Sequence, residues 1–111
     1  MGKRRITFNL GVTYSTPKEK LKRCVQKIEQ LLYGHEQVDK ELIIVRFNEF
    51  NDSSLDIFIY FFTKSIVWVE WFETKEDINF KIMNILKEEG VSVAFPSRSI
   101  YVEKAEEENI E

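Results

Sequence analysis

The chain has 111 residues, of which 43% are hydrophobic and 32% charged, with four glycines and two prolines. These values are typical of one soluble globular domain that folds without a metal, and the single cysteine excludes an intramolecular disulfide. The longest apolar run, IFIYFF at residues 57–62, is far shorter than the roughly 20 residues of a membrane helix, so this chain does not cross a bilayer by itself.

The charge is unevenly distributed along the chain, whose formal net charge is −3. Residues 103–111 hold five acids and one lysine, a net charge of −4, so residues 1–102, with 14 acids and 15 bases, carry +1. An acidic run at a chain end is usually solvated, and we predict that residues 105–111 are disordered. The rest of the chain lacks the basic excess on which nucleic-acid binding depends.

Residues 5–14 alternate between apolar and polar side chains, a period of two that predicts a strand with one buried face. The apolar row consists of Ile6, Phe8, Leu10, Val12 and Tyr14, and the polar row of Arg5, Thr7, Asn9, Gly11 and Thr13.

Residues 16–34 carry helix signals at both ends and along one side. Thr16 is a suitable N-cap, Pro17 fits the first helical position, and Glu19 completes a capping box. Gly34 is a natural stop after the last turn. The apolar side of the predicted helix consists of Leu21, Cys24, Val25, Ile28, Leu31 and Leu32.

A hairpin is predicted next, after a polar loop at residues 34–41. Residues 42–50 and 55–64 have strand patterns, and the NDSS between them has turn chemistry. The first strand places Ile43, Val45 and Phe47 on one face. The second strand is apolar on both faces, so both must be covered. Its two rows are Leu55, Ile57, Ile59 and Phe61, and Phe58, Tyr60 and Phe62.

A second helix is predicted over residues 67–90, where Gly90 ends it. Trp68, Trp71 and Phe72 lie either in its first turns or in a packed lead-in. Its apolar side consists of Ile78, Ile82 and Ile85, with Met83 and Leu86 as further candidates.

Two strand-like runs follow the second helix. Residues 91–95 predict a fourth strand, and residues 99–103 form another run that has no partner left in the chain. Pro96 separates the two runs, because proline cannot donate a ladder hydrogen bond.

The order β-α-β-β-α-β predicts an α+β, ferredoxin-like fold, with two helices on one face of an antiparallel sheet and a short C-terminal assembly strand. We assign residues 4–96 to the ferredoxin-like domain, residues 97–104 to the C-terminal strand and residues 105–111 to an acidic tail.

The sequence offers no catalytic, cofactor-binding or metal-binding set, so we expect no enzyme and no cofactor. Cys24 falls in an apolar helix stripe, which favours a core role, and His35 is expected in a surface loop without ligand spacing around it. Four acids of the second helix have helical spacing that is typical of a solvated face: Glu70, Glu73, Glu76 and Asp77. Lys81 is placed to pair with Asp77.

The aromatic row of the third strand raises an alternative, a free-standing binding module for RNA or a small effector. RNA-recognition domains share this topology and stack bases on alternate rings, as Phe58, Tyr60 and Phe62 could. However, NDSS stands where that motif begins with a basic residue and glycine, and the first strand adds no ring on the same face. A protein interface explains the row better, because rings gathered on a surface are rarely left in water.

Four stretches in order carry a family likeness: RRITFNLGVTYSTPKEKL, VRFNEFNDSSLDIFIYFFT, EDINFKIMNILKEEGVSVAFP and AFPSRSIYV. From about residue 4 to residue 102, the chain resembles the cytoplasmic C-terminal α/β region of the small-conductance mechanosensitive channel (MscS) family. The likeness is most specific at GVTY, SSLDI and EEGVSVAFPSRSIYV. Val93, Ala94 and Ser97 stand where that family more often has Ile or Phe, Pro, and Gln.

The resemblance implies one part of a channel. Members of that family are homo-heptamers whose membrane helices and middle β domain precede this region, and the cytoplasmic domains form a hollow cage. The pore releases ions and osmolytes under membrane tension in the cell (inner) membrane. This chain would then be a fragment that supplies the cage wall, without the pore, and that binds other copies of itself and no nucleic acid.

The resemblance also implies where the copies meet. The unpartnered strand would join those of the other subunits in a small parallel barrel, and the aromatic row would lie under a neighbouring subunit or the missing β domain. The interface residues expected on this basis are Phe58, Tyr60, Phe62, Ser99, Ile100, Tyr101 and Val102.

Overall fold

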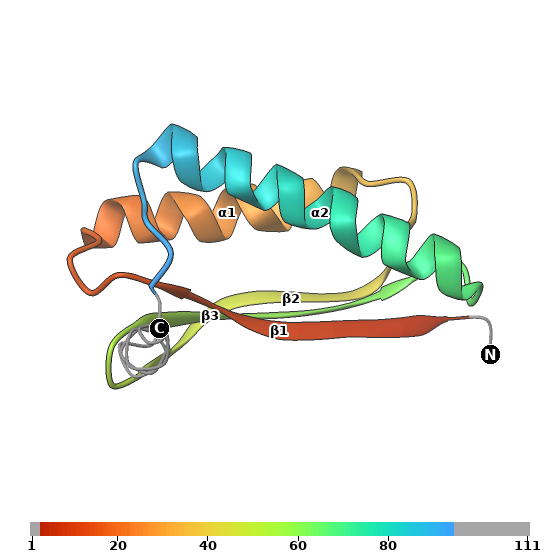
Figure 1. Ribbon diagram of the computed structural model, residues 1–111, viewed down its shortest axis with the longest axis horizontal. Coiled ribbons are helices and arrows are strands. Elements are labelled where there is room, and N and C mark those ends of the chain that lie inside the picture. Colours follow the sequence, from red (N-terminus) through yellow and green to blue (C-terminus); the bar gives the residue numbers. More distant parts are fainter. Residues whose placement is uncertain (1–2, 95–111) are drawn as a thin grey trace, which may run out of the picture.

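Two helices lie over one face of a three-stranded antiparallel sheet in the computed structural model, which describes residues 3–94 (Figure 1). The prediction of an α+β fold with both helices on one side of the sheet is confirmed. In chain order the elements are β1 (Arg4–Val12), α1 (Lys18–Gly34), β2 (Val38–Phe50), β3 (Leu55–Thr63) and α2 (Trp68–Glu89).

Strand β3 lies at the centre of the sheet, whose order is β1-β3-β2. It pairs antiparallel with β1 from Thr63 opposite Arg4 to Leu55 opposite Val12. It also forms the predicted hairpin with β2, whose register shifts at two irregularities, between Asp39 and Ile44 and between Phe47 and Glu49. Every backbone contact within the sheet therefore passes through β3.

The predicted fourth strand at residues 91–95 is present only as an isolated bridge between Val12 and Val93. Two backbone hydrogen bonds hold it: Thr13 donates to Ser92 at 3.0 Å, and Ala94 donates to Gly11 at 2.9 Å. The bridge lies at the outer edge of β1, where a ferredoxin-like sheet has its fourth strand. Residues 3–94 do not complete that four-stranded order, and residues 95–104 lie outside the described part.

The hydrophobic core fills the space between the sheet and the two helices. From β3, every second side chain points into it, and each of these is at most 6% exposed, because a strand turns alternate side chains to opposite faces. Cys24 is fully buried among these side chains, so its predicted core role is confirmed. The buried apolar residues of this core are Ile6, Val12, Leu21, Cys24, Ile28, Leu32, Val38, Ile43, Val45, Leu55, Ile57, Ile59, Phe61, Ile78, Ile82, Leu86 and Val91.

The prediction of a polar loop at residues 34–41 is wrong over its second half, because β2 already begins at Val38. Val38 is fully buried and lies opposite Thr63 in the sheet. An edge strand can carry polar side chains on its solvent side. The charged residues that follow Val38 are therefore compatible with a strand, although their composition is typical of a loop.

The predicted caps of α1 are also wrong. Pro17 occupies the N-cap with ψ 149°, and no side chain caps the helix. Thr16 instead closes a turn, in which its amide donates to the carbonyl of Thr13 at 3.1 Å. Gly34 remains helical at the other end, and His35 takes the C-cap position in extended conformation.

Helix α2 ends as predicted at Gly90, which adopts the left-handed conformation with φ 70°. The amide of Val91 donates to the carbonyl of Leu86 at 2.9 Å, and that of Gly90 donates to Lys87 at 3.1 Å. These two bonds form a Schellman motif. Val91 and Leu86 are both buried, so the motif turns the chain back onto the core.

Ion pairs join the two helices at one end of their contact. The Glu89 carboxylate, whose side chain is 8% exposed, lies 2.7 Å from Lys27 and 2.8 Å from Arg23. The hydrogen bond from Lys27, followed by that from Arg23, holds the pKa of Glu89 below its usual range.

A second set of polar contacts joins the helices at the other end. The Nε2 atom of His35 lies 2.7 Å from Asp77, and its side chain is only 12% exposed, so the predicted surface location of His35 is wrong. Lys81 lies 3.0 Å from the same carboxylate, as predicted. The hydrogen bonds from His35 and then Lys81 lower the pKa of Asp77.

We expect Gly90→Ala to lower the free energy of unfolding by about 1–2 kcal/mol, because an L side chain is strained in the left-handed region. An added Cβ would also lie 3.2 Å from the Lys20 ammonium. Urea unfolding measures the change. Gly34→Ala is the matched control: it is helical with open space around it, so stability should hold or rise. An equal loss in both variants would contradict the Schellman assignment.

We expect Glu89→Gln to destabilise the chain at neutral pH, with a difference from the unaltered chain that shrinks in acid. The pKa of Glu89 is lower in the folded state than its ordinary value of 4.5. Its stabilisation is therefore fully present above about 4.5 and is lost as the pH falls through the lower folded value. Thermal melts from pH 7 to pH 2 measure this. The more exposed Glu88, 3.5 Å from Lys27, is the control, and Glu88→Gln should change little.

Candidate assembly surface

The open face of the sheet carries a row of three aromatic side chains on β3, and all three are half-buried. The ring centroids of Phe58 and Tyr60 are 6.0 Å apart, and those of Tyr60 and Phe62 are 5.7 Å apart. Figure 1 shows both helices on the opposite face, so no element among residues 3–94 covers this row. We call these three residues the aromatic row.

An arginine borders the aromatic row on each neighbouring strand, and one apolar residue of β2 extends the row. On β1, Arg5 lies opposite Phe62, with its guanidinium carbon 6.0 Å from the Tyr60 ring centre. On β2, Ile44 lies opposite Tyr60 and Arg46 opposite Phe58. An apolar centre with a polar border is the usual arrangement in a protein–protein interface.

The structure therefore brings together three of the residues expected at an interface, namely Phe58, Tyr60 and Phe62. The other four expected residues, Ser99, Ile100, Tyr101 and Val102, lie outside the described residues. The alternation of β3 was enough to predict the shared face of the first three, and their role at an interface stays a prediction.

A second aromatic cluster fastens the start of α2 to β1. Trp68, Trp71 and Phe72 lie in the first turns of the helix, which settles the alternative left open by the sequence. The Trp71 indole N–H donates to the Arg5 carbonyl at 3.3 Å. The Arg4 guanidinium lies 4.2 Å from the Trp68 ring centre.

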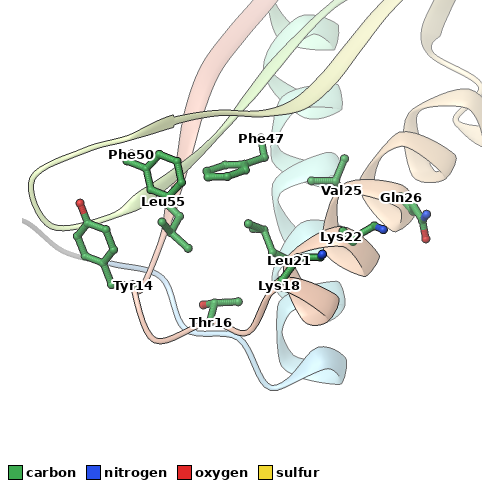
Figure 2. Close-up of a pocket in the computed structure, with 10 residues that line it drawn as sticks. All are labelled: Tyr14, Thr16, Lys18, Leu21, Lys22, Val25, Gln26, Phe47, Phe50 and Leu55. Carbon is green, nitrogen blue, oxygen red and sulfur yellow. The ribbon is translucent and has the colours of Figure 1, made fainter.

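An apolar groove opens between the first turns of α1 and the adjoining ends of β2 and β3 (Figure 2). Its volume is about 720 Å³. Phe47 and Phe50 lie on its strand side, with ring centroids 5.1 Å apart. Sequence reasoning missed this groove, although aromatic residues that continue beyond the buried part of a strand could have indicated it. The remaining lining residues are Tyr14, Thr16, Lys18, Leu21, Lys22, Val25, Gln26 and Leu55.

Three further features of the described residues concern metal binding, thiol reactivity and membrane spanning. Within residues 3–94, no three His, Cys, Asp or Glu side chains gather as a metal site would require. Burial raises the pKa of the Cys24 thiol, which disfavours the reactive thiolate. Neither α1 nor α2 is long and apolar enough to span a bilayer.

Comparison with protein families decides the identity of the fold. The family described as "Mechanosensitive ion channel MscS, C-terminal" matches residues 6–93, which include all three strands, both helices and the bridge at Val93. The chain belongs to the MscS family of mechanosensitive ion channels. The match corresponds to the C-terminal domain of this family.

Several relatives in the MscS family are similar over nearly the whole chain. The MscS family protein YhdY of Bacillus subtilis is 44% identical over 96% of this chain and 29% of its own length. The low conductance mechanosensitive channel YnaI of Escherichia coli is 38% identical over 93% of this chain and 30% of its own. The small-conductance mechanosensitive channel MscMJ of Methanocaldococcus jannaschii is 31% identical over 92% of this chain and 29% of its own length. The chain thus spans about three tenths of these MscS proteins.

Two solved structures share the fold of this chain. Arabidopsis thaliana MSL1 superposes with a TM-score of 0.76 and 16% identity, over 86% of this chain and 35% of the MSL1 chain. Helicobacter pylori MscS in its closed state superposes with a TM-score of 0.66 and 21% identity, over 86% of this chain and 36% of the MscS chain. At these identities the superpositions establish the α+β fold alone.

We expect the Cys24 thiol to stay unreactive toward a thiol reagent in the folded chain and to react fully in denaturant. Complete burial excludes the reagent, and the raised pKa keeps the thiol protonated. Mixing the chain with a chromogenic disulfide at pH 8 measures the rate. A Glu73→Cys variant, which adds an exposed thiol, is the positive control. Rapid modification of Cys24 under native conditions would contradict a core role.

Proposed function

We propose that this chain is the cytoplasmic cage wall of an MscS-family mechanosensitive channel, and that the full-length channel releases ions and osmolytes under membrane tension. In this proposal seven copies assemble, membrane helices in a longer protein anchor them in the cell (inner) membrane, and this domain lies on the cytoplasmic side. The domain supplies wall and assembly contacts, and the pore lies elsewhere in the longer protein. Nucleic acid is not a partner.

The aromatic row is the observation that carries this proposal. Three half-buried rings on an uncovered sheet face cost free energy unless another protein surface covers them. The membership in a channel family supports subunit assembly, rather than catalysis, as the purpose of that surface. Relatives that are named as mechanosensitive channels and are more than three times as long support a further, membrane-bound part.

The C-terminal residues contribute a second set of contacts in the same proposal. Residues 97–104 would form a strand that joins its counterparts in a small parallel barrel, with Ser99, Ile100, Tyr101 and Val102 at the subunit contact. A strand with no partner in its own chain is a liability unless other chains pair with it. The acidic residues 105–111 would follow as a solvated tail.

The channel function is tested with the complete protein that contains this domain. Expressed in bacteria that lack their own mechanosensitive channels, it should restore survival of a sudden osmotic downshock and give tension-activated currents in membrane patches. Apolar spans of about 20 residues should precede this domain in the reading frame. A complete protein without such spans, or without currents, would refute the channel proposal and favour a free-standing binding module.

The interface role of the aromatic row is tested with Phe58→Asp combined with Tyr60→Asp. Two carboxylates on this face should abolish heptamer assembly, because burying an unpaired charge costs several kcal/mol. Native mass spectrometry of the detergent-solubilised protein measures the subunit number. Gln30→Asp with Tyr33→Asp, on the exposed side of α1, is the matched control and should leave assembly unchanged. A normal heptamer with the Phe58 and Tyr60 changes would contradict the interface.

A further inference from the structure

Helix α2 carries a second apolar side that does not face the core. Val69, Phe72, Phe80 and Met83 are between 56% and 65% exposed. Their spacing of three, eight and three residues places them along one side of the helix. The buried residues Ile78, Ile82 and Leu86 lie on the other side. We call the four exposed residues, together with Glu73 and Glu76, the α2 stripe.

The acidic members of the α2 stripe lie among its apolar members. Glu73 and Glu76 line a shallow hollow of about 370 Å³ with Val69 and Phe72. Both glutamates are exposed, and neither takes part in an ion pair among the described residues. The stripe therefore presents apolar side chains beside two uncompensated negative charges.

The groove between α1 and the hairpin has the complementary character. Its lining is apolar, and two exposed lysines of α1, Lys18 and Lys22, stand at its border (Figure 2). Neither lysine takes part in an ion pair within residues 3–94. An amphipathic helix laid into a hydrophobic groove is a recurring recognition mode, in which residues three, four and seven positions apart anchor the helix.

One copy cannot join its own stripe to its own groove. The groove lies near the start of α1 and the β2–β3 turn, whereas the stripe begins in the first turn of α2, toward the opposite end of the molecule (Figure 1). The stripe also faces away from the sheet, because the core-facing residues of α2 are on its other side. The two surfaces can meet only between different chains.

We propose that the α2 stripe of one copy docks into the groove of a second copy, with Glu73 and Glu76 against Lys18 and Lys22. Such a contact is heterologous, since it joins two different surfaces, and a heterologous contact that closes on itself generates a ring. The inference rests on the proposed self-assembly and names a contact for it that is separate from the aromatic row. The charges set the orientation, and the apolar side chains supply the burial.

Charge reversal tests the contact with this chain alone. The groove variant carries Lys18→Glu with Lys22→Glu, and the stripe variant carries Glu73→Lys with Glu76→Lys. Because each reversal changes the charge by two, the net charge of −3 becomes −7 in the groove variant and +1 in the stripe variant. All four side chains are exposed, so both variants should keep the melting temperature of the unaltered chain.

Sedimentation velocity up to about 1 mM chain, the effective concentration that tethered modules reach, measures self-association. The unaltered chain should associate, and each variant alone should associate at least about tenfold more weakly, because like charges then face each other. An equimolar mixture of the two variants should associate again, since each surface of one variant then faces the opposite charge on the other.

A control variant distinguishes repulsion at the proposed contact from the effect of the net charge of the chain. Lys40→Glu with Lys64→Glu gives the same net charge of −7 as the groove variant but leaves the groove and the stripe intact, so this control should associate as the unaltered chain does. Failure of the mixture to associate would overturn the contact. An unaltered chain that stays monomeric at 1 mM would overturn it as well, and would point to another occupant such as the acidic residues 103–111.

The outcome is distinguishable from a failure of the channel proposal. Sedimentation of this chain requires neither a pore nor a membrane. If the complete protein gave no protection from downshock but the isolated chain showed the charge-dependent association, the channel proposal would be refuted and the contact would stand. Intact channel function in a complete protein whose isolated domain shows no such association would refute the contact and keep the channel.

Discussion

Strand β3 is apolar on both of its faces, and the remaining structure is arranged around that constraint. One of its rows packs against both helices and is almost completely buried. At about 1.5–3 kcal/mol for each large side chain, this burial is a main source of the fold's stability. The other row has no such cover within residues 3–94. In the proposed function another protein surface covers this row, and the apolar character of β3 on both faces is the observation from which that proposal starts.

The helices contribute more than a cover for the core. Polar contacts join them at both ends, through Glu89 at one end and through Asp77 at the other. These contacts fix α2 relative to α1, and therefore also fix the direction in which the exposed side chains of α2 point. The groove likewise depends on the position of α1 relative to the hairpin. Both surfaces of the inferred contact are consequences of how the core is packed.

Sequence periodicity was sufficient for the parts of the fold in which one pattern dominates. The alternation of β3, the stripe of α1 and the glycine that ends α2 all predicted the observed structure, and the quoted motifs led to the correct family. Prediction failed where tertiary contacts decide the outcome. Val38 lies in a strand because β3 offers it backbone partners, and the largely buried side chain of His35 contacts Asp77, which is far away in the sequence. Neither contact leaves a local signal.

The candidate surfaces also differ in how far the sequence could predict them. The aromatic row could be predicted, because its three residues lie on one strand. The groove draws residues from four parts of the chain, so no single pattern reveals it. Met83 shows most directly where prediction from periodicity fails. It was a candidate for the core side of α2, yet it is 62% exposed. Its position on the helix fits the outer side, and only the packed structure separates these two sides.

The bridge between Val12 and Val93 also determines how the domain would bear a mechanical load. The last described residues are attached to the edge of β1 by two backbone hydrogen bonds, and Val91 is anchored beneath the end of α2. A force applied through residues that follow Ala94 would first strain those two bonds and would reach the core only after they had opened. The edge of β1 is thus the first part of the sheet on which such a force would act.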